Sequence, residues 1–108
     1  MVQYKVYHSK RFDGDLGKFD KDFHEQVDKI ENQLMENPYL GDSLSLKWFR
    51  EKRIREKRIY FLVYDDLKAV FMVAISGKKD QQRVINTIRL LLESFRKELD
   101  NLANEEFI

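Results

Sequence analysis

The apolar and polar positions in the first third of the chain predict a strand followed by two helices. Residues 2–7, VQYKVY, alternate with the period of two that is typical of a short strand. A helical period then begins after Ser9, a residue suited to an N-cap. The period ends at Asn37-Pro38, because the residue before a proline avoids the helical region of backbone conformations. The apolar residues that recur at helical spacing are Phe12, Leu16, Phe19, Phe23, Val27, Ile30 and Leu34.

The middle of the chain changes to the period and the residue types of strands. Residues 58–64 (RIYFLVY) and 69–75 (AVFMVAI) are rich in β-branched and aromatic residues, and the DDLK between them is a natural turn. Residues 46–54, LKWFREKRI, form a third candidate strand, joined to the next by a tight turn around residues 55–57. These segments predict three consecutive strands in an antiparallel meander.

A helical period returns after Gly77 and predicts one long C-terminal helix over about residues 79–103, roughly six turns at 3.6 residues each. Its apolar stripe consists of Val84, Ile85, Ile88, Leu91, Leu92, Phe95, Leu99 and Leu102. The predicted order is therefore β-α-α-β-β-β-α. We expect a single α+β domain over residues 1–108, with a small, mostly antiparallel sheet packed by helices.

The composition narrows the possible chemistry. The chain of 108 residues contains no cysteine, which excludes disulfides and thiolate chemistry and suits a reducing cytoplasm. The N-terminus lacks an apolar signal region, and the longest apolar run, residues 69–75, is too short to span a bilayer, so we expect a soluble, cytoplasmic protein that does not bind membranes. His8 and His24 are isolated from other ligand types, so we expect no metal site.

One segment has a charge that differs from the rest of the chain. Residues 47–58, KWFREKRIREKR, hold seven basic and two acidic residues, a charge of +5, whereas the whole chain has +1. One interpretation is an edge strand whose charges deter aggregation. The other is an anion-binding surface, because the one-sided charge produces a positive potential beside Trp48, Tyr60 and Tyr64, aromatic residues that are able to stack on bases.

Alternation along this segment divides its side chains between two faces of a strand. Arg50 and Lys52 share one face, and Glu51 and Arg53 share the other. We expect Glu51 and Arg53 to pair with each other or across the sheet, which would remove Arg53 from any set of residues that faces a ligand.

A second basic cluster, Lys78 and Lys79, follows the last strand at the junction with the C-terminal helix. These are either ordinary solvated lysines or part of a phosphate site, because amides at a helix N-terminus bind phosphate. In the predicted meander the junction is expected to approach Arg50 and Lys52, which favours the phosphate site.

The segment from Asn37 to Gln82 combines NP followed by G and L with FREKRI, KRIYFLVYDD and an apolar strand that ends in SGKKDQQ. In these features it resembles the RelE/ParE superfamily of toxins from bacterial and archaeal toxin–antitoxin modules, whose order of strands and helices is also the predicted one. The resemblance covers about residues 2–85. It implies a RelE-like fold, here with a C-terminal helix longer than in the compact members.

RelE-type members are metal-independent endoribonucleases that cut mRNA on the ribosome. The resemblance therefore implies the toxin of a type II module, an mRNA interferase without a cofactor, whose partners are a cognate antitoxin and mRNA on the ribosome. By position it implies a catalytic set that consists of Arg50, Lys52, Arg58 and Lys79. Further RNA-binding residues are expected around that set, at Lys47, Trp48, Arg55, Lys57 and Lys78.

This catalytic set is consistent with attack of a ribose 2′-hydroxyl on the adjacent phosphate. Lys52 is a candidate general base, because crowded cations depress the pKa of a lysine. Arg50 and Arg58 would stabilise the charge that develops on the phosphorane oxygens. Lys79 would assist at the phosphate or at the leaving 5′-oxygen.

Two alternative functions stay open. Many RelE-type enzymes use a C-terminal Tyr or His as acid or base, and the corresponding region here reads QQRVINTI. The alternatives are a ParE-like inhibitor that poisons DNA gyrase by binding, and a non-catalytic member held by partners. If the C-terminal helix outruns the sheet, its exposed apolar end, at Leu99, Leu102 and Phe107, is a candidate partner or homodimer surface.

Overall fold

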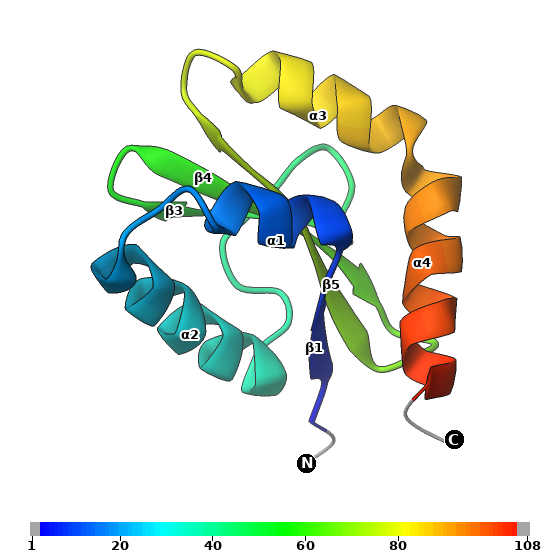
Figure 1. The fold of residues 1–108 in the computed structure, drawn as a ribbon. Coiled ribbons are helices and arrows are strands. Elements are labelled where there is room, and N and C mark those ends of the chain that lie inside the picture. The colour runs from blue at the N-terminus through cyan, green and yellow to red at the C-terminus, as the bar shows by residue number, and fades with distance from the viewer. Residues whose placement is uncertain (1–2, 106–108) are drawn as a thin grey trace.

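A five-stranded sheet with helices on both faces forms the centre of the protein (Figure 1). The computed structural model describes residues 3–105. In chain order the elements are β1 (Lys5–His8), α1 (Lys10–Leu16), α2 (Lys21–Glu36), β2 (Asp42–Ser43), β3 (Phe49–Ile54), β4 (Lys57–Tyr64), β5 (Ala69–Gly77), α3 (Gln81–Leu90) and α4 (Leu92–Glu105). Across the sheet the order is β1-β5-β4-β3-β2, with β1 parallel to β5 and the other pairs antiparallel. The α+β class and the mostly antiparallel sheet are confirmed.

The two N-terminal helices begin at side-chain caps. Ser9 Oγ accepts a hydrogen bond from the backbone N–H of Phe12 at 3.0 Å, and Asp20 Oδ1 accepts one from that of Phe23 at 2.9 Å. Each cap satisfies an N–H group that has no acceptor within its own helix. α2 ends directly before the Asn-Pro pair, as predicted from the sequence.

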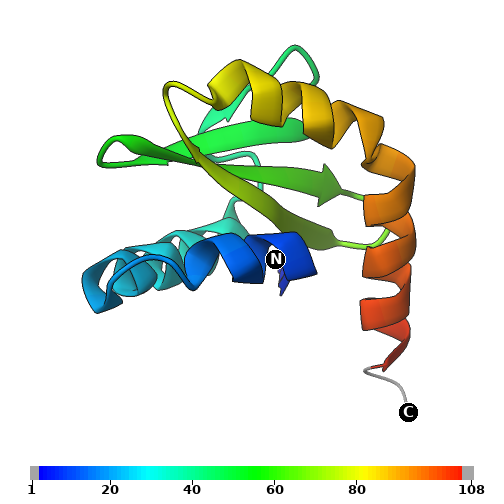
Figure 2. The same ribbon diagram turned by 45° about the horizontal axis from the view of Figure 1, so that its top comes forward.

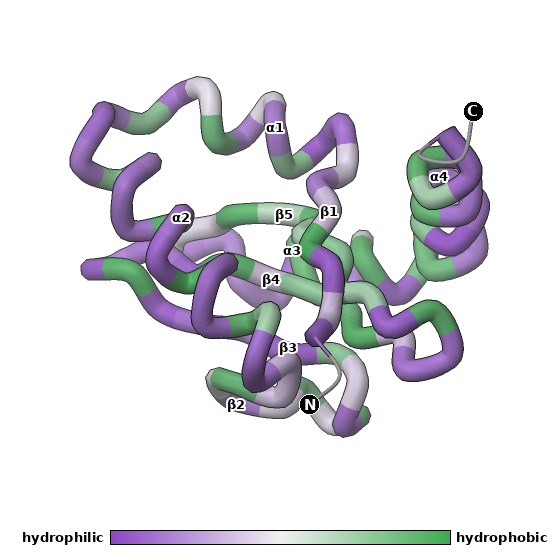
Figure 3. The backbone as a smooth tube through the Cα atoms, turned by 90° about the horizontal axis from the view of Figure 1, so that it is seen from below, coloured by the Kyte–Doolittle hydropathy of each residue, from purple (hydrophilic) through white to green (hydrophobic). Residues whose placement is uncertain are grey.

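The sheet separates two apolar cores. Figure 2 shows α1 and α2 on one side of the sheet and α3 on the other. Ile59 and Phe61 of β4 pack in the core that includes residues of α1 and α2, whereas Tyr60 and Leu62 pack in the core that includes residues of α3 and α4. We call these two sides the α2 face and the α3 face. Figure 3 shows β5 as mostly hydrophobic, because helices cover this strand on both faces.

The C-terminal segment forms two helices, so the single long helix predicted from the sequence is wrong. α3 ends at Leu90 and α4 begins at Leu92, and the chain turns sharply between them (Figure 1). At the break, the Leu91 amide donates to the carbonyl oxygens three and four residues earlier, at 3.0 and 3.1 Å. The apolar stripe continues through the turn, because buried residues of both helices belong to the core on the α3 face.

This turn also changes the expected surface of the C-terminal helix. Leu99 is buried and Leu102 packs against the same core, so the prediction that they form an exposed partner or dimer surface is wrong. Phe107 lies outside the described residues. The apolar side chain that is left exposed at the turn is Leu90, at 86%. Within residues 3–105, no helix is both long enough and apolar enough to cross a membrane.

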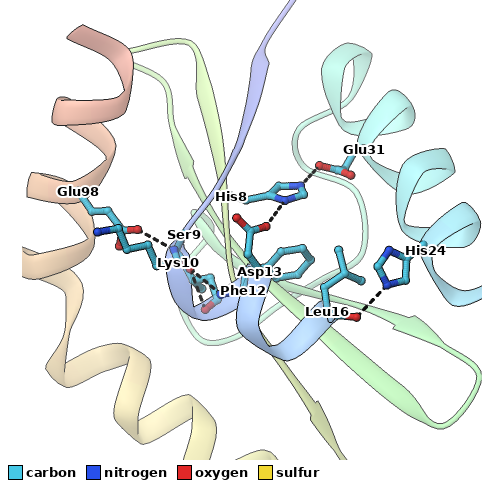
Figure 4. A network of polar contacts seen from close by, with 10 residues as sticks. His8, Ser9, Lys10, Phe12, Asp13, Leu16, His24, Glu31 and Glu98 are labelled. Atoms are coloured by element: carbon cyan, nitrogen blue, oxygen red, sulfur yellow. Dashed lines mark hydrogen bonds and ion pairs between the residues drawn. The ribbon is translucent and has the colours of Figure 1, made fainter. Parts of the chain in front are cut away.

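His8 connects β1 to both N-terminal helices (Figure 4). Its Nδ1 lies 2.8 Å from Oδ1 of Asp13 in α1, and its Nε2 contacts Oε1 of Glu31 in α2. Burial lowers the pKa of His8, but hydrogen bonds and charges, first from Glu31 and then from Asp13, outweigh it. The net effect raises the pKa above its ordinary 6.5. The charged imidazolium is therefore the form that these two carboxylates stabilise.

We expect the free energy of unfolding to fall as the pH rises through the folded-state pKa of His8. Because this pKa is raised, the stabilisation is fully present below the unfolded-state value and is lost as the folded imidazolium deprotonates. Urea unfolding between about pH 6 and pH 9 measures the effect, and His8→Gln should flatten this part of the profile. The matched control is His24→Gln, because the His24 imidazole hydrogen-bonds the Leu16 carbonyl oxygen instead of a carboxylate. An identical slope in wild type and His8→Gln would contradict the prediction.

Candidate active site

A basic cleft of about 640 Å³ lies where the β3–β4 hairpin meets the connection between β5 and α3. The residues that line this basic cleft are Arg53, Glu56, Lys57, Arg58, Gly77, Lys78, Lys79 and Asp80. Five of them are lysines or arginines and two are carboxylates, so the walls carry an excess of positive charge. A concave surface with one dominant sign of charge concentrates the field and attracts anions.

The register of β3 against β4 decides which basic side chains face this cleft. Arg53 pairs with Arg58, and Lys52 pairs with Ile59. Residues that are directly opposite each other in a ladder project on the same side of the sheet. Since Ile59 is buried on the α2 face, Lys52 projects toward that face, while Arg53 and Arg58 project toward the α3 face.

Arg50 and Lys52 therefore lie on the opposite face from Arg58, and the expectation that they approach Lys78 and Lys79 is wrong. The alternation along β3 was predicted correctly. It divides the side chains into two sets, but it does not show which set faces the β5–α3 connection.

Arg50 is committed to the protein's own backbone. Its Nε donates to the Leu40 carbonyl oxygen at 3.0 Å, Nη1 to that of Lys47 at 3.0 Å, and Nη2 to that of Gly41 at 2.9 Å. These bonds hold the chain on both sides of β2 and satisfy carbonyl groups outside the ladder. Arg50 thus has a structural role that the sequence pattern did not indicate.

Arg58 is the buried cation of the basic cleft. The residue is 7% exposed, its Nε lies 3.8 Å from Glu51 Oε2, and its Nη1 has no hydrogen-bond partner among the described residues. Leaving a buried donor unpaired costs about 1–3 kcal/mol, and more for a charged group. Arg58 is therefore the one cation of the cleft lining with a buried donor left unpaired among the described residues.

Glu51 pairs across the sheet with Arg58, which is one of the two arrangements expected from the sequence, whereas Arg53 is not withdrawn from the ligand-facing set, since it lines the basic cleft. Arg58 is buried on the neighbouring strand and lies diagonally across the ladder from Glu51, within reach of a long side chain. Gln81, the first residue of α3, donates its Nε2 to both carboxylate oxygens of Glu51 at 3.4 and 3.2 Å. The Glu51 side chain is 13% exposed. Gln81 is uncharged, and although it falls within the segment SGKKDQQ, nothing in the sequence predicted this contact.

Tyr60 lies in the core beside this pair and is not available for stacking on bases. The residue is fully buried, its hydroxyl lies 2.8 Å from Ser76 Oγ, and Ser76 Oγ is 3.1 Å from the Gly77 carbonyl oxygen. Burial raises the pKa of Tyr60 above 10.0, so the hydroxyl stays protonated. The prediction that Tyr60 forms part of a stacking surface is wrong, because this residue faces the core on the α3 face.

Lys47 and Trp48 belong to a different cleft, at the other end of β4. The residues that line this aromatic cleft, of about 470 Å³, are Tyr39, Lys47, Trp48, Val63, Tyr64, Asp65, Asp66, Leu92 and Arg96. Asp65 of this cleft accepts hydrogen bonds from the hydroxyls of Tyr4 and Tyr39 at 2.6 and 2.5 Å, and the bond to Tyr39 raises the pKa of Tyr39 to about 12. The length of β4 separates the two clefts by roughly 23 Å at 3.3 Å per residue. Lys47 and Trp48 therefore do not join Lys57 and Lys78.

The hairpin tip separates the last two predicted RNA-binding residues. Arg55 has a positive φ of 55° at the turn, and its guanidinium forms an ion pair with Asp22 in α2. Lys57 is opposite Ile54 in the ladder and therefore projects toward the α2 face, where its Nζ lies 5.9 Å from the centre of the Phe19 ring. It contributes only to the edge of the basic cleft, beside Gly77. Of the residues predicted from the sequence, Lys57, Arg58, Lys78 and Lys79 are brought together, and Arg53 joins them.

No protein-family model and no curated protein matches the sequence of this chain. The fold, in contrast, is similar to several solved structures. One is the toxin–antitoxin complex RelBE2 from Mycobacterium tuberculosis, with a TM-score of 0.63 and 20% sequence identity, over 72% of this chain and 94% of that chain.

Two structures of the E. coli toxin RelE are also similar. A mutant in the free state has a TM-score of 0.67 and 20% identity, over 78% of this chain and 92% of that chain. The isolated toxin has a TM-score of 0.62 and 17% identity, over 79% and 98% of the two chains. At these identities the likeness is one of fold. The chain therefore has the fold of the RelE toxins, which confirms the RelE-like fold that the resemblance implied.

Proposed function

We propose that this protein is the toxin of a type II toxin–antitoxin module and that it cleaves mRNA in the basic cleft. The observation that carries the proposal is Arg58, a buried guanidinium whose Nη1 has no partner within the described chain and which lines a cleft with four other cations. This cleft is built on the fold of the RelE toxins.

The geometry suits cleavage of RNA by its own 2′-hydroxyl. Attack of that hydroxyl on the neighbouring phosphate concentrates negative charge on the phosphorane oxygens, and fixed cations lower the barrier by stabilising this charge. Arg58 offers planar N–H donors that match a phosphate, while Lys78 and Lys79 offer mobile ammonium groups from the connection between β5 and α3. Arg53 adds a cation that would contact the RNA backbone.

The proposed partners are a cognate antitoxin and mRNA on the ribosome, in the cytoplasm. Two of the similar structures are complexes of a toxin with its antitoxin, RelBE2 from M. tuberculosis and RelBE from E. coli. An antitoxin segment with acidic residues would be complementary to the five cations of the basic cleft and would compete with RNA for them. Binding of the antitoxin over this cleft would therefore inhibit the toxin.

A ParE-like inhibitor of DNA gyrase is the second candidate. The observation that favours it is the lining of the basic cleft, where neither His nor Tyr is found among the described residues. Such a side chain commonly serves as the acid or base in phosphate chemistry. Under this alternative, cleaved DNA–gyrase complexes accumulate while mRNA stays intact. A non-catalytic member of the fold would show neither toxicity nor affinity for RNA.

We expect Arg58→Ala to reduce mRNA cleavage by about 10²–10³-fold, because it removes a donor that stabilises the transition state. Primer extension on mRNA after induced expression measures the cleavage, with growth arrest as a second readout. Lys52→Ala on the opposite face is the matched comparison, and from the geometry we expect it to retain activity. Loss of activity in Lys52→Ala with an intact fold would support the general-base role implied by the resemblance. Full activity of Arg58→Ala would contradict the site.

We expect the double variant Lys78→Gln with Lys79→Gln to bind single-stranded RNA more weakly and with less dependence on salt. Each phosphate contact to a single strand contributes a slope of about −0.7 to log K against log salt, so the slope should shrink by up to about 1.4. Fluorescence anisotropy with a labelled oligonucleotide measures both quantities. Lys47→Gln in the aromatic cleft should change neither quantity. Equal losses in the two variants would place RNA outside the basic cleft.

A further inference from the structure

Three side chains from three elements form a continuous contact that ends in the basic cleft. Nε2 of Gln81 in α3 donates hydrogen bonds to both carboxylate oxygens of Glu51 in β3. The same carboxylate lies 3.8 Å from Nε of Arg58 in β4. Glu51 is not among the described residues that line the cleft, whereas Arg58 is. Any influence of Glu51 on a bound anion therefore passes through Arg58.

Arg58 needs such a partner because its cross-strand neighbour is also a cation. Arg53 and Arg58 are directly opposite each other in the ladder, on the same face of the sheet. Like charges in this relation are destabilising, and they favour side-chain conformations that separate the two guanidinium groups. The Glu51 carboxylate, 3.8 Å from Nε of Arg58, offsets this repulsion and attracts that edge of the guanidinium by its charge.

Fixing one edge of a guanidinium determines the direction of the others, because the group is planar and its donors have a fixed geometry. With Nε attracted to Glu51, one orientation of Nη1, which has no partner within the described chain, is favoured over the others. Orientation of this kind contributes to catalysis, because a small misplacement of a stabilising group weakens its interaction with the transition state.

We propose that Glu51 is a positioning residue for the RNA cleavage proposed above, on which this inference rests, and that Gln81 supports it. The Glu51 carboxylate orients Arg58 toward the phosphate and takes no proton from the substrate. Two other roles would have different consequences. If Glu51 only lowered the positive charge of the cleft, its removal would strengthen RNA binding without reducing cleavage. If it only stabilised the fold, the folded variant would cleave at the wild-type rate.

The test uses Glu51→Gln, which keeps the shape of the side chain and its ability to contact Gln81 but removes the charge. On ribosomes programmed with mRNA, we expect kcat to fall by about 10- to 100-fold, by comparison with the range found when a residue that orients a metal ligand is removed. Affinity for a 2′-deoxy oligonucleotide, which lacks the attacking hydroxyl, should be unchanged or higher, because a negative charge has been removed. Thermal unfolding identifies the folded fraction of each variant.

Gln81→Ala provides an independent arm. It should lower kcat less than Glu51→Gln does, and it should have no further effect in the Glu51→Gln background, because both changes act through the same contact. The matched control is Gln82→Ala, since the exposed Gln82 donates to Asn86 within α3, at 3.0 Å, and lies outside the contact between Gln81 and Arg58.

The outcomes separate this inference from the proposed function. Wild-type or faster cleavage by folded Glu51→Gln, while Arg58→Ala is inactive, leaves the ribonuclease in place and overturns the role of Glu51. Additive effects of Gln81→Ala and Glu51→Gln also overturn it. An absence of cleavage in every protein, wild type included, overturns both the function and the inference.

Discussion

The two-residue turn between Ile54 and Lys57 sets the register of β3 against β4, and the composition of both faces of the sheet depends on that register. Because side chains alternate with a period of two, a slip by one residue would exchange every side chain of β3 between the faces. Ile54 and Ile59 are buried on the α2 face, and Tyr60 is buried on the α3 face, so such a slip would expose apolar side chains and bury charged ones. The same constraint places Arg58 beside Glu51 and keeps Arg50 on the other side.

The buried pair of Glu51 and Arg58 is difficult to explain as a contribution to stability. The desolvation of two charges often exceeds their attraction, and apolar residues at such positions are frequently as stable or more so. Here the guanidinium also keeps a buried donor without a partner in the described chain. A pair of this kind fits a site that exchanges hydrogen bonds with an incoming anion better than it fits a structural core. The cations around it, Lys78 and Lys79 among them, line the same cleft.

Most of the fold was predictable because its elements have clear periods, and the exceptions have physical reasons. β2 has two residues and owes its place to pairing with β3, a contact between distant residues that no local period reveals. The break at Leu91 was missed because the apolar stripe passes through it unchanged, with Ile88 before it and Phe95 after it in the same core. A period reports which residues are buried, but it does not report the direction in which the next turn of helix continues.

The sequence by itself determined the elements, the alternation along β3 and the concentration of basic residues on one hairpin and at one strand-to-helix connection. It also contained Arg58, Lys78 and Lys79 of the basic cleft. Only the tertiary structure decided which basic residues meet, because the pairing of β3 with β4 and the packing of α3 select one of the two alternating sets. That selection assigned Arg50 to backbone carbonyl groups, and it brought Glu51 and Arg58 together at the cleft.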